Sequence, residues 1–261
     1  MELLKTIRRR SFLSESVYVS LNIALALAVL IIVWTVESPV PALLLVLLSK
    51  WRIFAVRPRY WMANVQSNLV DIIVNVSAVM LMYSVVGMAN GLFVQILLAV
   101  LYAAWLIVLK PRSTTKAVVA QAATALVAGT MVLFVSSYSW PIELVVLAMA
   151  GLGYVVTRHA LVRYKEDHLQ FLSLTWAFVM AQLGWVLSHW VIAYTVPILE
   201  VRIPQAALVV SVISFVAFKV YVSYKQHEQV RSVDVTLPIL FCVSIIFVLM
   251  VFFSNIPIGT L

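Results

Sequence analysis

Charged residues are scarce in this sequence. They make up only 11% of its 261 residues, whereas 64% of the residues are hydrophobic. Soluble domains typically carry about 25% charged residues, so the composition excludes an ordinary water-soluble protein. Basic residues outnumber acidic ones by 18 to 10. Because the basic residues occur in short clusters between apolar runs, their role in membrane orientation explains them, and nucleic acid is not an expected partner.

Cysteine and the common catalytic motifs are also lacking. The single cysteine, Cys242, allows neither an intrachain disulfide nor a thiolate metal cluster. No H-E-x-x-H, G-x-S-x-G or phosphate-binding glycine loop occurs, and Glu166 and Asp167 form the only adjacent acidic pair. We therefore expect no catalytic residue, no metal and no cofactor. A lipid-modifying enzyme that uses this acidic pair at the cytoplasmic face is the least favoured of three functional hypotheses.

What the chain does contain is a series of apolar runs long enough to cross a bilayer. They predict an all-α fold, a polytopic transmembrane helix bundle of about nine spans that forms a single integral membrane domain over residues 1–261. The first run follows a basic N-terminal segment but no small-residue cleavage site, so it is expected to be retained. The predicted spans are 17–36, 40–56, 66–86, 91–109, 117–136, 141–157, 169–196, 203–222 and 235–254.

The distribution of basic residues predicts the orientation. If the nine runs alternate in direction, all but one of the 18 basic residues fall on one side, and only Arg202 falls on the other. The positive-inside rule then puts the N-terminus in the cytoplasm and the C-terminus outside a plasma membrane. Two cytoplasmic loops are expected to meet anionic lipid or a partner protein. Their basic residues are Lys50, Arg52, Arg57 and Arg59 in one loop and Arg158, Arg163 and Lys165 in the other.

One segment carries a family resemblance. The stretch from Leu48 to Ile73, LSKWRIFAVRPRYWMANVQSNLVDII, resembles a segment of uncharacterised membrane proteins of Saccharibacteria and related small-genome bacteria. It covers about a tenth of the chain. The resemblance implies a bacterial plasma membrane and no particular activity.

Polar residues inside two predicted spans are the candidate functional residues. In the third span they are spaced by 4, 3 and 4 residues and therefore share one helical face: Asn64, Asn68, Asp71 and Asn75. Asp71 must be paired, protonated or hydrated at that depth. The seventh span contributes Gln182, Trp185 and His189. If the two stripes face each other, they form a polar track through the membrane.

Two functional hypotheses remain open beside the enzyme. The first is a small-solute or ion permease, with Asp71 as the ion-responsive or proton-responsive group and His189 at the outer mouth of the polar track. Neither span is visibly broken by glycine or proline at its middle, as transporter helices often are, which counts against transport. The second is a non-catalytic membrane subunit or assembly factor, whose polar residues hold helices together and which binds a protein partner or a second copy.

Overall fold

The fold is an all-α bundle. The structure is a computed structural model, and it describes residues 12–189, 192–196 and 201–252. Eight of the described helices are long and apolar enough to cross a membrane, and α2 is a shorter apolar helix. The helices are α1 (Phe12–Val36), α2 (Pro39–Ser49), α3 (Trp61–Ser84), α4 (Gly91–Ala104), α5 (Thr115–Ser136), α6 (Ile142–Val162), α7 (Leu169–Ser188), α8 (Gln205–His227) and α9 (Ser232–Phe252).

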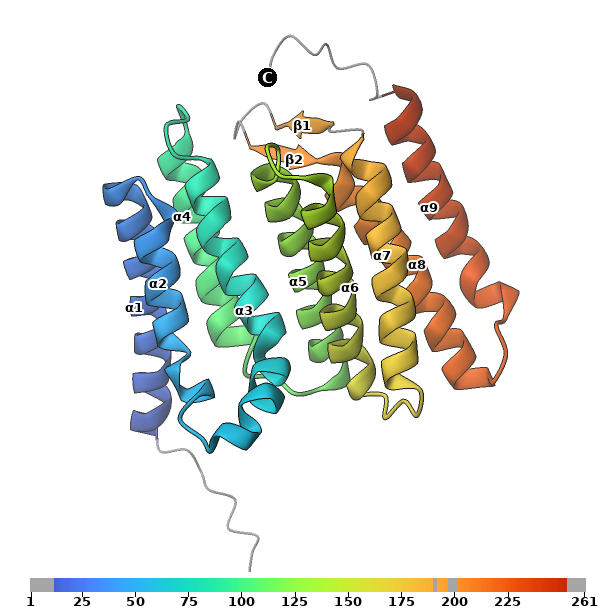
Figure 1. Cartoon of the computed structure of the whole chain (residues 1–261), viewed down its shortest axis with the longest axis horizontal. Coiled ribbons are helices and arrows are strands. Elements are labelled where there is room, and N and C mark those ends of the chain that lie inside the picture. The colour runs from blue at the N-terminus through green and yellow to red at the C-terminus, as the bar shows by residue number, and fades with distance from the viewer. Residues whose placement is uncertain (1–11, 190–191, 197–200, 253–261) are drawn as a thin grey trace, which may run out of the picture.

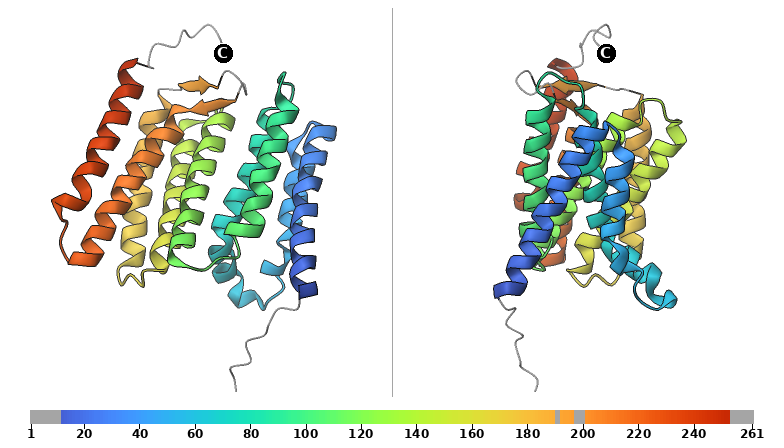
Figure 2. Two further views of the ribbon diagram at one scale, coloured as in Figure 1. Left: turned by 180° about the vertical axis from the view of Figure 1, so that it is seen from behind. Right: turned by 90° about the vertical axis from the view of Figure 1, so that its left-hand side faces the viewer.

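Successive helices alternate in direction and form two neighbouring groups (Figures 1 and 2). Helix α1 packs on α2, α3 and α4, whereas α5 packs on α6 and α8, α6 on α7, and α8 on α9. Helix α3 joins the two groups through its contacts with α5 and α6. We call the end of the bundle where α1 begins the inner end, and the opposite end the outer end. The connections α2–α3, α6–α7 and α8–α9 lie at the inner end (Figure 1).

The second predicted span is only partly helical. Ser38 accepts a hydrogen bond from the backbone N–H of Val40 and starts α2, but the helix ends at Ser49 after 11 residues. At about 1.5 Å per residue, α2 covers roughly half of the ~30 Å hydrocarbon core. The chain then forms two 3₁₀ turns, η1 (Trp51–Ile53) and η2 (Pro58–Tyr60), before α3 starts. The crossing predicted over 40–56 is thus a half-length helix followed by a folded connector.

The seventh predicted span, over 169–196, is also shorter than expected. Helix α7 ends at Ser188, and the apolar residues that follow include strand β1 (Ala193–Thr195). This strand pairs antiparallel with β2 (Arg202–Pro204) at the outer end. The segment 192–196 is rich in β-branched and aromatic residues, which favour a strand over a helix. Hydropathy alone does not separate the end of a helix from an apolar strand that follows it.

Helices α6 and α7 approach each other through glycine. A Cβ atom on Gly153 of α6 would lie 2.7 Å from Cγ of Met180 on α7, and one on Gly184 of α7 would lie 2.8 Å from Cγ of Met149 on α6. On each of the two helices, a glycine therefore packs against a methionine of the other helix. Small residues of this kind let helix backbones pack closely in membranes.

Candidate functional site

The polar stripe of α3 contains the candidate site. The Asn64 side chain donates a hydrogen bond to the backbone carbonyl of Ile53 in η1 at 3.3 Å, and Asn68 donates to the carbonyl of Asn64 at 2.8 Å. Asp71 and Asn75 are buried, with 9% and 0% of their surface exposed. The stripe thus runs from hydrogen bonds near the inner end to a charged group inside the bundle.

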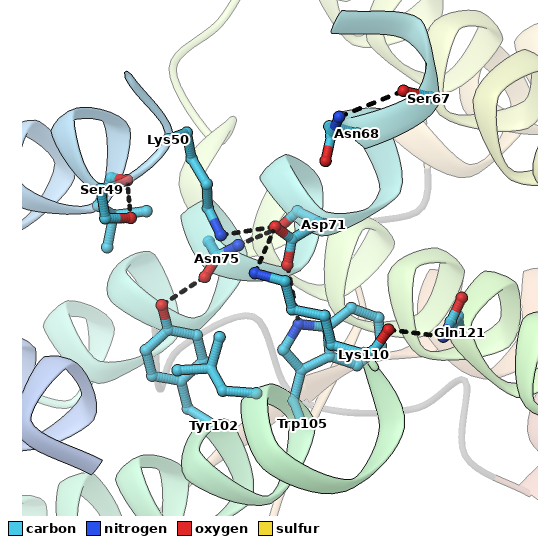
Figure 3. Close-up of polar contacts among 12 residues, drawn as sticks. Ser49, Lys50, Ser67, Asn68, Asp71, Asn75, Tyr102, Trp105, Lys110 and Gln121 are labelled. Atoms are coloured by element: carbon cyan, nitrogen blue, oxygen red, sulfur yellow. Dashed lines mark hydrogen bonds and ion pairs between the residues drawn. The ribbon is translucent and has the colours of Figure 1, made fainter. Parts of the chain in front are cut away.

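Two lysines share the Asp71 carboxylate (Figure 3). Nζ of Lys50 lies 2.5 Å from Oδ2 of Asp71, and Nζ of Lys110 lies 3.0 Å from the same oxygen. The Lys50 side chain is 10% exposed and that of Asp71 is 11% exposed, whereas 31% of the Lys110 side chain is exposed. Lys110 therefore forms the accessible side of a three-residue charge cluster, which consists of Lys50, Asp71 and Lys110.

Neutral donors bond to Asp71, one at its carboxylate and one at its backbone carbonyl. Nε1 of Trp105 donates to Oδ1 of Asp71 at 3.3 Å, so the second carboxylate oxygen also has a partner. The Asn75 amide donates to the backbone carbonyl of Asp71, and the Tyr102 hydroxyl donates to Oδ1 of Asn75. Asn75 thereby links α3 to α4. Ordered donors around a buried carboxylate reduce the cost of removing it from water.

Two irregular segments bring the lysines to Asp71. Lys50 follows the last residue of the half-length helix α2, and its backbone N–H closes the final turn on the carbonyls of Leu47 and Leu48. Lys110 follows η3 (Trp105–Leu109), a π-helical turn that continues α4. π-Helical turns and interrupted helices are frequent at functional sites. The charge cluster therefore lies where two helices depart from regular α geometry.

Side chains from neighbouring helices fix the π-helical turn. The Tyr18 hydroxyl of α1 donates to the carbonyl of Leu106 at 3.1 Å. On the other side, the buried Gln121 of α5 donates to three backbone carbonyls, at 2.7 Å to Leu109, 3.3 Å to Lys110 and 2.9 Å to Arg112. Nε2 of His159 lies 2.9 Å from Oε1 of Gln121. Gln121 thus adds a side-chain donor to carbonyls at the end of the helix, where N–H donors become scarce, although the Leu109 carbonyl also accepts from the Arg112 N–H at 3.2 Å.

The charge cluster has an excess of positive charge. With both lysines and Asp71 ionised, its net charge is +1. A single Lys–Asp pair would be neutral and sufficient to join two helices, and each further charge in a low-dielectric interior costs several kcal/mol unless it has a counter-ion. Lys110 contributes the second positive charge, and its side chain is the more exposed of the two lysines.

The seventh span does not meet this site. Helix α7 packs on α6, whereas α3 packs on α4, α5 and α6. Gln182, Trp185 and His189 are exposed on the outside of α7. His189 bonds through Nδ1 to the Trp185 carbonyl at 2.7 Å. The polar track predicted between the third and seventh spans is therefore not formed in the described part of the chain, because α6 lies between the two helices.

The basic residues of the two predicted loops differ in how exposed they are. Most of these residues are exposed at the inner end: Arg52, Arg57, Arg59, Arg163 and Lys165. Arg158 is partly buried, and its Nε has no hydrogen-bond partner within the described residues. Lys50 is the exception, since it turns into the bundle towards Asp71 instead of reaching the lipid headgroups. The N-terminal basic residues lie outside the described residues.

Glu166 of the acidic pair is engaged by α8. Nζ of Lys225 lies 2.9 Å from Oε2 of Glu166, and the Tyr221 hydroxyl donates to the same oxygen at 2.8 Å. These hydrogen bonds, that from Lys225 first, lower the pKa of Glu166 below its usual value of 4.5. In the described part of the chain, no three His, Cys, Asp or Glu side chains gather to hold a metal ion. Glu166 therefore has a structural contact between the α6–α7 loop and α8.

Replacing Glu166 with glutamine is expected to cause a small loss of stability that depends on pH. Because the pKa of Glu166 is depressed in the folded protein, its contribution is present above pH 4.5 and is lost as the pH falls through the folded pKa. Thermal unfolding in detergent should show a lower midpoint for Glu166→Gln at neutral pH and a shrinking difference below pH 4.5. Asp167→Asn, an exposed neighbour with the same charge change, is the control and should lower the midpoint less at neutral pH.

An outer cavity lies at the opposite end of the molecule. It has a volume of about 740 Å³ and is lined by the outer ends of α3, α4 and α5 and by the β1–β2 hairpin. Arg202, the one basic residue that the structure describes at the outer end, is part of its lining. Gln95 and Thr130 are adjacent in sequence to lining residues, and each has a buried oxygen without a hydrogen-bond partner among the described residues.

These features define the class of the protein. Eight long apolar helices with a charged residue cluster inside the bundle are those of a multi-pass membrane protein. Comparisons of the chain with protein-family models, with curated proteins and with solved structures gave no match.

Proposed function

We propose that the chain is a permease for a small anionic solute, with the charge cluster of Lys50, Asp71 and Lys110 as its binding centre. The observation that carries this proposal is the carboxylate shared by two ammonium groups, which leaves one positive charge uncompensated. An anion that approaches from the inner end replaces Asp71 as the partner of Lys110, while Asp71 keeps Lys50. Ionisable groups at membrane depth are typical of solute and ion pathways.

Two further features support transport. The charge cluster lies where α2 stops after 11 residues and where α4 becomes a π-helical turn, and discontinuous helices are a common setting for transporter binding sites. The outer cavity carries Arg202, so that both candidate ends of the path have positive charge. The proposed location is a bacterial plasma membrane with the inner end in the cytoplasm, as the excess of basic residues at that end favours.

Flux through liposomes tests the proposal with chloride and inorganic phosphate as probe anions. Wild-type protein should release at least one of them, and Lys110→Met should reduce that rate by a factor of about ten or more, because the remaining Lys50–Asp71 pair is neutral. Lys110→Arg should retain much of the flux. The matched control is Lys116→Met, which removes an exposed lysine of the same inner end. No release of either anion, or equal rates for Lys110→Met and wild type, would contradict the proposal.

The alternative function is a non-catalytic membrane subunit or assembly factor. It is favoured by Asn64, Asn68 and Asn75, whose amides are all used in hydrogen bonds within the bundle. In that case the exposed basic loops at the inner end bind a protein partner or anionic lipid. The flux experiment separates the two functions, since a subunit of this kind releases neither anion.

A further inference from the structure

Helix α7 has one face that nothing in the described bundle covers. Its opposite face packs on α6 through buried residues such as Ala177, Met180 and Gly184. Figure 1 shows α7 at the front of the molecule, with no helix before it. We call the uncovered side the α7 stripe. We define it by the exposed residues Phe171, Thr175, Phe178, Gln182, Trp185 and His189, and Leu174 and Val186 are exposed at its two edges.

The α7 stripe follows a heptad pattern. Its members are separated by 4, 3, 4, 3 and 4 residues, so that Phe171, Phe178 and Trp185 form one row and Thr175, Gln182 and His189 form the next. This spacing keeps a stripe facing a second helix along its whole length when the two helices cross at a shallow angle. Lipid chains require no such repeat.

Gln182 gives the strongest indication that another helix covers the stripe. It is exposed and makes no hydrogen bond to any described residue, whereas Thr175 donates to the carbonyl of Phe171 at 2.9 Å. At about 1.5 Å per residue, Gln182 lies ~20 Å along the helix from Leu169, well inside a hydrocarbon core of about 30 Å. A primary amide left unpaired in lipid is costly, and no described residue of this chain pairs with it, so we look for its partner beyond the described bundle.

We propose that the α7 stripe is the interface of a homodimer, with α7 of a second copy as its occupant. Two copies inserted in the same orientation are related by a two-fold axis along the membrane normal, which brings each stripe residue opposite its own counterpart. Glutamine suits this arrangement because its amide both donates and accepts, so the two Gln182 side chains satisfy each other. From Phe171 to Trp185 the helix carries no formal charge that would select a partner of opposite charge. The inference does not depend on the proposed transport activity.

Cysteine crosslinking in native membranes tests the geometry. Cys242→Ala removes the only cysteine of the chain, and single cysteines are then introduced by Phe178→Cys or Trp185→Cys. Both should form a disulfide-linked dimer at least about ten times faster than Phe241→Cys, an exposed position on α9. Equal rates at the α7 and α9 positions, or crosslinks to a protein of a different mass, would overturn the proposal.

The strength of the dimer tests the role of Gln182. Dilution of labelled protein into liposomes, followed by energy transfer between labels, gives the dissociation constant. Gln182→Leu should weaken the dimer by roughly threefold to twentyfold, which is the range for hydrogen bonds between membrane helices, while Gln182→Asn should retain more of the affinity. A wild-type protein that stays monomeric, or a Gln182→Leu variant with an unchanged dissociation constant, would refute this interface.

Discussion

Replacing Asp71 with leucine is expected to lower the free energy of unfolding by about 3–5 kcal/mol, the range for removing one partner from a buried ion pair. The substitution leaves the ammonium group of Lys50, whose side chain is only 10% exposed, without a counter-charge. It also removes the acceptor of the Trp105 indole N–H. Unfolding by sodium dodecyl sulfate in mixed micelles, followed by tryptophan fluorescence, measures the loss.

A second substitution distinguishes loss of charge balance from a packing defect. Lys50→Met in the Asp71→Leu background removes the orphaned cation, and it should recover most of the stability because apolar replacements of buried ion pairs are often tolerated. Asp71→Asn should be destabilising too, since an amide does not neutralise two ammonium groups. If Asp71→Leu stays within about 1 kcal/mol of wild type, the charge cluster contributes little to folding.

Gly153→Leu is expected to destabilise the protein by about 3 kcal/mol, near the upper end of the range for overpacked cores. The added Cβ would lie 2.7 Å from Cγ and 2.8 Å from Cβ of Met180, and 3.3 Å from Cα of Ala177. A rotamer change can move Cγ of Met180, but Cβ of Met180 and Cα of Ala177 are fixed by the backbone, so the helices themselves must shift. The same unfolding assay measures the effect, and Gly184→Leu should behave similarly against Met149.

The matched control lies on the same helix. A Cβ on Gly151 would have no atom within 4 Å, so Gly151→Leu should leave stability nearly unchanged. Met180→Ala should partly rescue Gly153→Leu, because it vacates the space that the new side chain needs. A destabilised Gly151→Leu protein would point to a general intolerance of α6 to substitution and would contradict the explanation by contact with α7.

Much of the fold follows from hydropathy and from the distribution of charge. Apolar runs of bilayer length predicted the helical bundle, because lipid forces the backbone to satisfy its own hydrogen bonds. The helix boundaries were harder to predict where one apolar run contained two structural elements. Leu48 and Ile53 belong to one apolar run, yet the helix stops between them, and the run that begins at Leu169 ends as the strand that contains Tyr194.

The candidate site was predicted only in part. The spacing of Asn64, Asn68, Asp71 and Asn75 predicted one helical face, and all four lie on α3, but the spacing did not indicate the partners of Asp71. Lys110 lies 39 residues further along the chain. Both Lys110 and Trp105 lie at the end of another helix, α4. Such partners are fixed by which helices pack together, and a hydropathy pattern does not specify that. The sequence also does not indicate the role of Gln121, because a single glutamine in a membrane span can have several ordinary roles.

The short α2 has a consequence for how the protein is made. A helix of 11 residues that is followed by a lysine partitions poorly into lipid on its own. The carboxylate that neutralises Lys50 leaves the ribosome 21 residues later, on α3. During synthesis α2 must therefore stay at the protein-conducting channel, or beside α1, until α3 follows it. We therefore expect the first three helices to enter the bilayer together, once the Lys50–Asp71 contact can form.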